Sequence, residues 1–328
     1  MDILPPGARV GGRYVLERVL GSGSMGTVYA ASDPSGARVA LKALAEPDSA
    51  QERRARFLRE AEVCAALRHP HIVPVIDHGV DAESGVPYLV MPLLAGEDLA
   101  TALDRAGALE PNVAVALFVQ ACEGLAAAHD RGVVHRDVKP SNLFLDISAG
   151  TIVVKVSDFG LAKTPTGVPA RSPSTGGLTA TGRFMGTPQY VSPEQAVSAK
   201  HVDARSDVFS LAMSLYHALT GAPAFAYVKS FMGLVLEITA REAPHLQDAA
   251  PWVPPAIARV VHGALLRDPA QRCPDVRELA LALDGAVGID ASRRRVDPRA
   301  VRTLPEAERR VRAPRAELAG SWDGVLRR

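Results

Sequence analysis

The chain has 328 residues, of which 47% are hydrophobic and 22% are charged, and its formal net charge is +1. This composition excludes a chain that is mainly disordered, and the length predicts one large two-lobed unit or two domains. The 37 basic and 36 acidic residues nearly balance, so we expect no nucleic-acid partner. The three cysteines are far apart and odd in number, which argues against a disulfide framework and against a paired zinc site.

Two features of the sequence bear on its compartment. No uninterrupted apolar run approaches the roughly 18–20 residues that cross a bilayer. The N-terminal segment lacks the basic and apolar regions of a signal peptide. We therefore expect a cytoplasmic protein with no membrane span in this chain.

The first part of the chain has the pattern of a small sheet. Residues 13–45 alternate apolar and polar side chains around glycine turns and predict three antiparallel strands. A helix is predicted over residues 50–68, where His69-Pro70 ends it. Two further apolar runs, residues 72–79 and 86–94, complete an expected five-stranded sheet with one helix.

After Gly96 the pattern becomes helical. Helices are predicted over residues 96–107, 111–132, 206–220, 230–241, 255–266 and 274–283, with strand-like pieces in 143–156. Residues 164–182 are rich in Thr, Ser, Pro and Gly and predict a loop. The Arg- and Pro-rich tail from about residue 285 has no sustained period. Its excess of basic residues leaves open an acidic-lipid contact or folding over the domain, with a flexible linker as the default.

The first chemical motif is a GxGxxGxV pattern at residues 21–28, between two predicted strands. Glycines let backbone N–H groups approach phosphate oxygens without interference from side chains. The pattern is weak alone, because an ordinary hairpin turn can have the same residues. A dinucleotide-binding fold is disfavoured, since the following helix and acidic residue are missing.

Lys42 follows Val39-Ala40-Leu41 on a later predicted strand. An ammonium group there could hold phosphates if a carboxylate orients it, although a solvated strand lysine is the ordinary alternative. The helix that follows offers two candidates for this carboxylate. Glu60 lies on the same side as Phe57 and Cys64, whereas Glu62 points about 200° away and should face solvent. We therefore favour Glu60.

The decisive motif is His135-Arg136-Asp137-Val138-Lys139-Pro140-Ser141-Asn142. The chain contains only two Asn, so an HRDxxxxN pattern would arise by chance in roughly three of ten thousand such chains. Asp137 is placed to accept a hydroxyl proton, and Asn142 to bind a metal ion that bridges phosphates. Asp158-Phe159-Gly160 follows and offers a second carboxylate for metal.

Together these motifs resemble the eukaryotic-like (Hanks-type) protein kinases, in particular the bacterial serine/threonine kinases, over about residues 14–283. Val191-Ser192-Pro193-Glu194 stands where the family has Ala-Pro-Glu. The resemblance implies an α+β, bilobal protein-kinase fold with a five-stranded antiparallel sheet and one helix in the N-lobe and a mainly helical C-lobe. The implied parts are an N-terminal extension (1–13), the N-lobe (14–95), the C-lobe (96–284) and the tail (285–328).

The resemblance also implies the site residues. ATP would be bound by Gly21, Ser22, Gly23, Ser24, Met25, Gly26, Val28, Ala40, Lys42, Met91, Leu93 and Leu143. The catalytic residues would be Asp137, Lys139, Lys42 and Glu60. Asn142 and Asp158 would hold Mg²⁺, with Mn²⁺ as the alternative. Asp207 would brace the backbone of the HRD motif, and Arg272 would pair with Glu194.

Other matches concern substrate and control. Within the family, Lys139 and Thr187 match the serine/threonine subclass, so the implied partners are proteins with Ser or Thr acceptors. Arg136 and Lys163 would bind a phosphate on Thr179 or Thr181, placed there by autophosphorylation. A transient homodimer would serve this reaction in trans.

Two other functions stay open at this level. A pseudokinase scaffold would bind nucleotide without transferring phosphate, although no motif member is missing. A small-molecule kinase, acting for example on an antibiotic or choline, is disfavoured because the stretch from Asp158 to Glu194 is long enough to dock a polypeptide.

Overall fold

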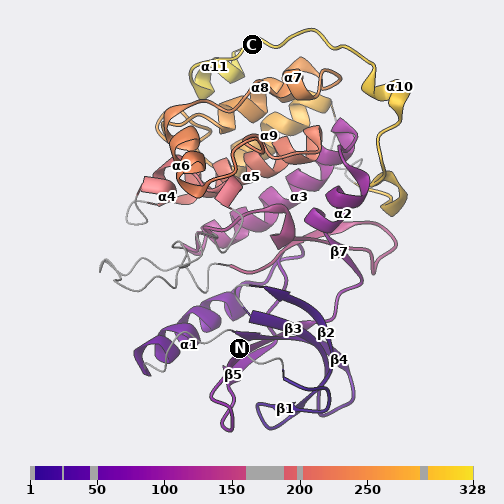
Figure 1. Cartoon of the computed structure of the whole chain (residues 1–328), viewed down its shortest axis with the longest axis vertical. Helices are drawn as coiled ribbons and strands as arrows, with labels where there is room; N and C mark the ends of the chain where they lie inside the picture. The colour runs from indigo at the N-terminus through magenta and orange to yellow at the C-terminus, as the bar shows by residue number, and fades with distance from the viewer. Residues whose placement is uncertain are drawn as a thin grey trace. The chain divides into compact units, whose positions relative to one another are not determined.

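The structure is a computed structural model that describes residues 4–23, 26–44, 51–159, 188–197, 202–288 and 295–327. The chain divides into two compact units, each of which is described by itself (Figure 1). The first contains Met1–His69 and Val73–Ala95, and the second contains Pro70–Ile72, Gly96–Gly160 and Thr187–Arg328. Among the described residues, those from Gly96 onward belong to the second unit, and Gly96 is where the sequence pattern changes from strands to helices.

The described part of the first unit is a six-stranded antiparallel sheet in the order β1-β2-β3-β4-β6-β5, together with one helix. Its elements are β1 (Arg9–Val10), β2 (Tyr14–Gly23), β3 (Gly26–Ser32), β4 (Arg38–Leu44), α1 (Gln51–Ala66), β5 (Asp77–Val80) and β6 (Pro87–Pro92). Successive side chains of a strand point to opposite faces, so alternate residues form one apolar layer. This layer consists of Val10, Tyr14, Leu16, Tyr29, Ala31, Val39, Leu41, Ala43, Tyr88 and Val90.

Strand β1 lies in the stretch that the sequence pattern assigned to an N-terminal extension, residues 1–13. In the structure Val10 pairs with Tyr14 and is buried in the apolar layer. The Gly11 N–H group also donates a 2.8 Å hydrogen bond to Asp81. The boundary at residue 13 is therefore wrong, because residues from Arg9 onward belong to the sheet. A two-residue strand is too short for alternation to reveal it.

The second unit is mainly helical. Its longer helices are α2 (Leu99–Ala106), α3 (Pro111–His129), α5 (Ala204–Thr220), α6 (Phe231–Ala240), α8 (Pro255–Ala264) and α9 (Val276–Val287). Its short helices are η1 (Pro140–Asn142), η2 (Pro188–Tyr190), α4 (Pro193–Val197), α7 (Leu246–Ala249), η5 (Pro298–Ala300), α10 (Glu306–Arg309) and α11 (Trp322–Leu326). The strands β7 (Gly96–Asp98), β8 (Leu143–Asp146) and β9 (Val153–Val156) form a small antiparallel sheet.

Helix α3 is the centre of the second unit. It contacts α5, α9 and β9, and Figure 1 shows α3, α5 and α9 packed side by side. By length and composition α3 could cross a membrane, which the sequence analysis did not foresee. However, 72% of its apolar window is buried inside the unit, as is usual for a core helix. The helix therefore does not indicate a membrane span.

The C-terminal tail differs most from the expectation. Residues 295–327 are docked on the second unit, where Leu304, Trp322 and Val325 are buried. The flexible linker expected from residue 285 is therefore wrong for these residues. Their apolar side chains are widely and irregularly spaced, so no helical or strand period marks them in the sequence.

Candidate active site

The backbone of residues 135–142, which we call the catalytic loop because they contain the expected catalytic Asp137, is held by a buried carboxylate on α5. Helix α5 begins after its N-cap Asp203, and Asp207 lies in its first turn with no solvent exposure. Its Oδ1 accepts a 2.8 Å hydrogen bond from the Arg136 N–H group, and its Oδ2 accepts one of 2.8 Å from the His135 N–H group. Oδ2 also lies 2.8 Å from His129 Nε2. The expected bracing role of Asp207 is confirmed.

His135 links this loop to the segment that carries Asp158. Its buried ring accepts the Asp137 N–H group at Nδ1, at 3.2 Å, which assigns the proton to Nε2. Nε2 then donates to the Ser157 carbonyl oxygen at 2.7 Å. The ring centroid lies 4.7 Å from that of Phe159. These contacts keep the two loops in a fixed relation.

Two residues of these loops have strained backbones. Arg136 has a φ of 64° and Asp158 a φ of 60°, and they are the two positive-φ residues other than glycine in the described part of the chain. Such conformations are uncommon for residues with a Cβ and concentrate at functional sites. Both residues belong to the motifs that the sequence analysis selected.

The side chains of the catalytic loop converge on Asp137. Lys139 Nζ donates a 2.9 Å hydrogen bond to Asp137 Oδ2. Asn142 Nδ2 donates to the Asp137 carbonyl oxygen at 2.8 Å and lies 3.4 Å from Oδ2. Because the Asn142 nitrogen is used in this way, its amide oxygen is oriented as an acceptor. The loop thus presents a carboxylate, an ammonium group and an amide oxygen together.

Asn142 and Asp158 are joined to each other through Ser157. The Ser157 N–H group donates a 2.9 Å hydrogen bond to the Asn142 carbonyl oxygen, and Asp158 follows directly. Oxygen ligands of this kind suit Mg²⁺, which takes one or two protein groups and completes its shell with water and phosphate oxygens. Among the described residues there is no group of three or more His, Cys, Asp or Glu side chains that could hold a metal.

A buried ion pair anchors the segment that follows Thr187. The Arg272 guanidinium group donates to both carboxylate oxygens of Glu194 on α4, at 2.8 and 3.0 Å. Burial alone would raise the pKa of Glu194, but the bonds and charge of Arg272 outweigh it, so the pKa is lowered. Gln195 Nε2 donates to the Arg136 carbonyl oxygen at 3.0 Å and so ties α4 to the catalytic loop. The expected pairing of Arg272 with Glu194 is confirmed.

A tyrosine–histidine pair that the sequence analysis missed lies beside this segment. The Tyr190 hydroxyl group is 2.7 Å from His217 Nδ1, and the two rings are stacked. Burial lowers the pKa of His217 to about 4, and burial also raises the pKa of Tyr190. His217 is therefore neutral near pH 7, and the tyrosine hydroxyl group can donate to it. No local motif announces a pair 27 residues apart.

The glycine hairpin belongs to the first unit. Gly21, Ser22 and Gly23 are exposed at the end of β2, whereas Ser24 and Met25 lie outside the described residues. Gly26 has a φ of 137°, and a Cβ there would come within 2.1 Å of the Ala43 carbonyl oxygen. Only glycine fits at this position, because the neighbouring atom belongs to the backbone.

Other predicted site residues of the first unit lie on adjacent strands. On β4, Lys42 is buried and pairs in register with Val28 of β3. Ala40, on the same strand, pairs in register with Met91 of β6. Leu93, just beyond β6, is half-buried. These positions form one patch of neighbouring strands.

Helix α1 carries Glu60 and Glu62, the two candidates for the carboxylate that orients Lys42. Glu60 is half-buried and Glu62 is exposed, as their places on the helix predicted.

Leu143 is buried in the second unit, directly after the catalytic loop. Lys163, Thr179, Thr181 and Thr187 lie outside the described residues.

Comparison with known proteins identifies the family. The family model of the protein kinase domain matches residues 14–279. The chain belongs to the protein kinase family. This match and the solved structure described next confirm the α+β, bilobal fold class that the resemblance implied, and the curated relatives described next confirm the resemblance to bacterial serine/threonine kinases.

Two curated relatives and one solved structure describe this similarity. The chain is 37% identical over 280 residues to a probable serine/threonine-protein kinase, CE0033, of Corynebacterium efficiens, which covers 83% of this chain and 41% of that protein. It is 36% identical over 296 residues to the serine/threonine-protein kinase PknD of Mycobacterium tuberculosis, covering 87% and 41%. The crystal structure of the Mycobacterium tuberculosis PknI kinase domain has a TM-score of 0.66 and 31% identity, covering 88% of this chain and 100% of that domain. The chain thus spans about two fifths of the length of these curated relatives.

Proposed function

We propose that this kinase-family chain transfers the γ-phosphoryl group of ATP to serine and threonine hydroxyl groups of proteins. The observation that carries the proposal is the convergence of Lys139 and Asn142 on Asp137, in a loop whose backbone Asp207 holds. A phosphoryl transfer needs little covalent chemistry from the protein, so positioning and fixed charge supply most of the catalysis. This loop offers both.

Each loop residue has a distinct part in the proposed reaction. Asp137 orients the acceptor hydroxyl group and takes up its proton as the new bond to phosphorus forms. Lys139, whose ammonium group bonds Asp137, neutralises charge on the phosphoryl group from the acceptor side. Lys42 holds the phosphates of the nucleotide, with Glu60 as its orienting partner. Asp137 faces the acceptor, so its loss should affect turnover more than nucleotide binding.

The nucleotide would bind with a divalent metal ion. Asn142 and Asp158 provide an amide oxygen and a carboxylate that fit Mg²⁺, with Mn²⁺ as the alternative. The ion, when bound, offsets the negative charge of the phosphates. The glycine hairpin at residues 21–26 would bring backbone N–H groups to the phosphates, and Ala40, Met91, Leu93 and Leu143 would contact the adenine.

We also propose control by autophosphorylation, and Arg136 supports this proposal. Its Nε is buried without a hydrogen-bond partner among the described residues. An unpaired buried donor on a charged group is costly, and a phosphate supplies strong acceptors for it. We place that phosphate on Thr179 or Thr181, with Lys163 as a second contact and a transient homodimer as the means of transfer between two copies.

The experiment that tests the proposed activity compares Asp137→Asn with Asp130→Asn. Asp130 is an exposed aspartate at the end of α3 that pairs with Arg277, so it serves as a matched surface control. The measurement is the transfer of radiolabelled phosphate from Mg-ATP to casein and to myelin basic protein. Asp137→Asn should lower kcat by about 10²- to 10⁴-fold with little change in the dissociation constant of ATP.

Two results would contradict the proposal. Wild-type turnover in the Asp137→Asn variant would remove Asp137 from the catalytic role. Nucleotide binding by the wild-type chain without any transfer to casein, to myelin basic protein or to itself would instead identify a pseudokinase scaffold.

A further inference from the structure

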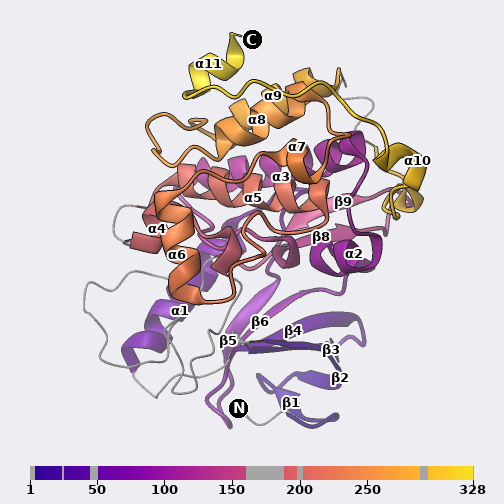
Figure 2. The ribbon, with the colours of Figure 1, turned by 45° about the horizontal axis from the view of Figure 1, so that its top comes forward.

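Residues 295–327 form a segment that we call the strap. It follows the part of the chain that matches the protein kinase family, which ends at residue 279. The strap begins at the small sheet, where the Ile152 N–H group donates a 2.9 Å hydrogen bond to the Val296 carbonyl oxygen. It then runs over the second unit and ends with α11 beside α8, as its yellow trace shows in Figure 2. It is therefore an additional layer on this unit.

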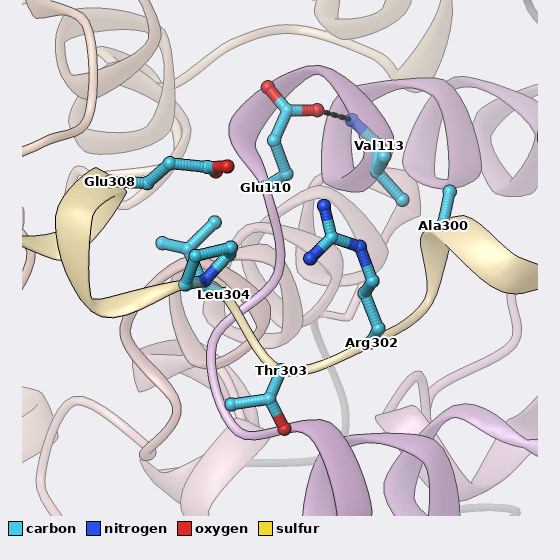
Figure 3. Close-up of a pocket in the computed structure, with 8 residues that line it drawn as sticks. Glu110, Val113, Ala300, Arg302, Thr303, Leu304 and Glu308 are labelled. Carbon is cyan, nitrogen blue, oxygen red and sulfur yellow. Dashed lines mark hydrogen bonds between the residues drawn. The ribbon is translucent and has the colours of Figure 1, made fainter.

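A cavity lies along part of the first half of the strap, although Val301 and Leu304 in the same stretch are buried. The cavity, of about 220 Å³, separates residues 300–308 from the start of α3 (Figure 3). Glu110, Arg302 and Glu308 line this cavity with polar groups. Glu110 is already used to cap α3, since it accepts hydrogen bonds from the N–H groups of Asn112 and Val113.

The middle of the strap is held by α7. Gln247 Nε2 donates to the Pro314 carbonyl oxygen at 2.9 Å, and its Oε1 accepts from the Ala316 N–H group at 2.7 Å. One side chain therefore bonds the strap twice, as a neighbouring strand would. The Ala313 N–H group adds a 2.8 Å bond to the Pro251 carbonyl oxygen.

The end of the strap is fixed by Trp322, which is only 4% exposed. Its N–H group donates to the Gln271 carbonyl oxygen at 2.8 Å, and its ring Nε1 donates to Glu278 Oε2 at 2.8 Å. The ring packs on Gly263 of α8, where a Cβ would come within 2.9 Å of the Trp322 ring and 2.6 Å of Val325. The absence of a side chain at Gly263 makes room for this seat.

The backbone N–H group of Trp322 bonds the loop that contains Arg272. Gln271, its backbone partner, directly precedes Arg272, whose guanidinium group is fully buried. This guanidinium group donates to the carbonyl oxygens of Leu266, Arg267 and Arg205. It also makes the two bonds to Glu194 described above. The loop of residues 266–273 thus bonds Trp322 through the Gln271 backbone and α4 through the Arg272 side chain.

We propose that Trp322 is a positioning residue for the phosphoryl-transfer site. Its buried ring, bonded to Glu278 of α9, sets the place of its backbone N–H group, which bonds Gln271 in the loop that presents Arg272 to Glu194. Glu194 and the neighbouring Gln195 in turn hold the segment Pro188–Val197 against the catalytic loop. This inference rests on the proposed kinase function for its kinetic consequence, whereas its structural consequence can be measured without activity.

The structural test is hydrogen–deuterium exchange on the full chain. Trp322→Ala should speed exchange of the amides in Pro188–Val197 and in residues 266–273. The matched control is Leu326→Ala in the same helix, because Leu326 is 59% exposed and should leave exchange in both segments unchanged. Trp322→Phe removes the Nε1 donor and Glu278→Ala removes its acceptor, and both variants keep an aromatic ring in the seat. Both should speed exchange in the same two segments, less than Trp322→Ala does.

The kinetic test separates the acceptor from the nucleotide. Couplings between such sites change affinity by about 2- to 30-fold. Trp322→Ala should therefore raise KM for casein or lower kcat within this range, while KM for ATP changes less than about twofold. A merely structural tryptophan would lower the midpoint of unfolding and leave these ratios intact at temperatures well below it.

The proposal is overturned if Trp322→Ala leaves exchange in Pro188–Val197 at the wild-type rate, whatever its effect on unfolding. If Trp322→Ala does not fold, Trp322→Phe and Gly263→Ala decide the same question, since the first removes the bond and the second blocks the seat. If the wild-type chain transfers no phosphate, the proposed function fails, and the exchange result still supports or overturns the role of Trp322.

Discussion

Asp207 accepts the backbone N–H group of His135 at 2.8 Å across 72 positions in the chain. The carboxylate also holds the next N–H group, that of Arg136, so two successive peptide units are fixed by one buried side chain. The strained φ of Arg136 is maintained at this point. The backbone geometry at His135 and Arg136 therefore depends on a buried side chain of α5.

The first prediction concerns Asp207→Asn. The amide keeps the shape but turns an NH₂ group toward backbone donors, which should lower the free energy of unfolding by about 3 kcal/mol. The catalytic loop should shift as well, and kcat should fall by up to about 100-fold. Denaturant unfolding and steady-state kinetics check the two effects.

Asp203→Ala is the matched control on the same helix. Asp203 caps α5 through the Arg205 N–H group, so its loss should cost about 1 kcal/mol. It has no bond to the catalytic loop among the described residues, and kcat should stay near the wild-type value. Equal losses of kcat in both variants would contradict the bracing role of Asp207.

The second prediction is a loss of stability in mild acid. Burial lowers the pKa of His217 to about 4 and, with help from His245, that of His262 to about 4. The unfolded chain binds protons at these groups near pH 6.5, so between about pH 6.5 and 4 it holds more protons than the folded chain. Stability should therefore fall as the pH is lowered through this window, by up to about 1.4 kcal/mol per pH unit for each histidine.

His217→Gln removes one of these groups while keeping a partner for the Tyr190 hydroxyl group. The variant should show a smaller slope of unfolding free energy against pH between 5 and 6.5 than the wild-type chain. Chemical denaturation at several pH values measures it. An unchanged slope would mean that His217 titrates alike in both states.

The third prediction contrasts two helical glycines. At Gly124 of α3, a Cβ would lie 2.3 Å from the His71 carbonyl oxygen, so Gly124→Ala forces two backbones apart and should cost about 1–3 kcal/mol. At Gly285 of α9, a Cβ would meet nothing within 4 Å, so Gly285→Ala should stabilise by about 0.5–1 kcal/mol. Unfolding in urea measures both. The same sign of change in both variants would contradict the packing described here.

The sequence was most informative about contacts between residues that lie close together in the chain. The bonds of Asp137 to Lys139 and Asn142 span two and five positions, and the residue types alone indicate their chemistry. The alternation of the strands and the period of the long helices likewise follow from local burial. The choice of Glu60 over Glu62 needed no distant information.

The sequence did not predict contacts between residues that lie far apart in the chain and belong to no motif. Trp322 bonds Glu278 across 44 positions, and Tyr190 bonds His217 across 27, with no pattern around either pair. The sequence of the tail favours a linker because its scattered apolar residues show no sustained period. Burial of single side chains such as Leu304 depends on the surface they meet, which the sequence of the tail does not contain.

The last prediction concerns the switch at Arg136. A phosphate on Thr179 or Thr181 carries a charge of about −1.5 to −2 and can accept several hydrogen bonds from a guanidinium group. It would pair the buried Nε that has no partner among the described residues and shift the population toward the active arrangement. Incubation with Mg-ATP should therefore place phosphate on one of these threonines, as mass spectrometry can detect. The Thr179→Ala, Thr181→Ala double variant should be markedly slower, with Thr164→Ala as a control outside the proposed pair. Full activity in the double variant would show that Arg136 is not switched by phosphate in this protein.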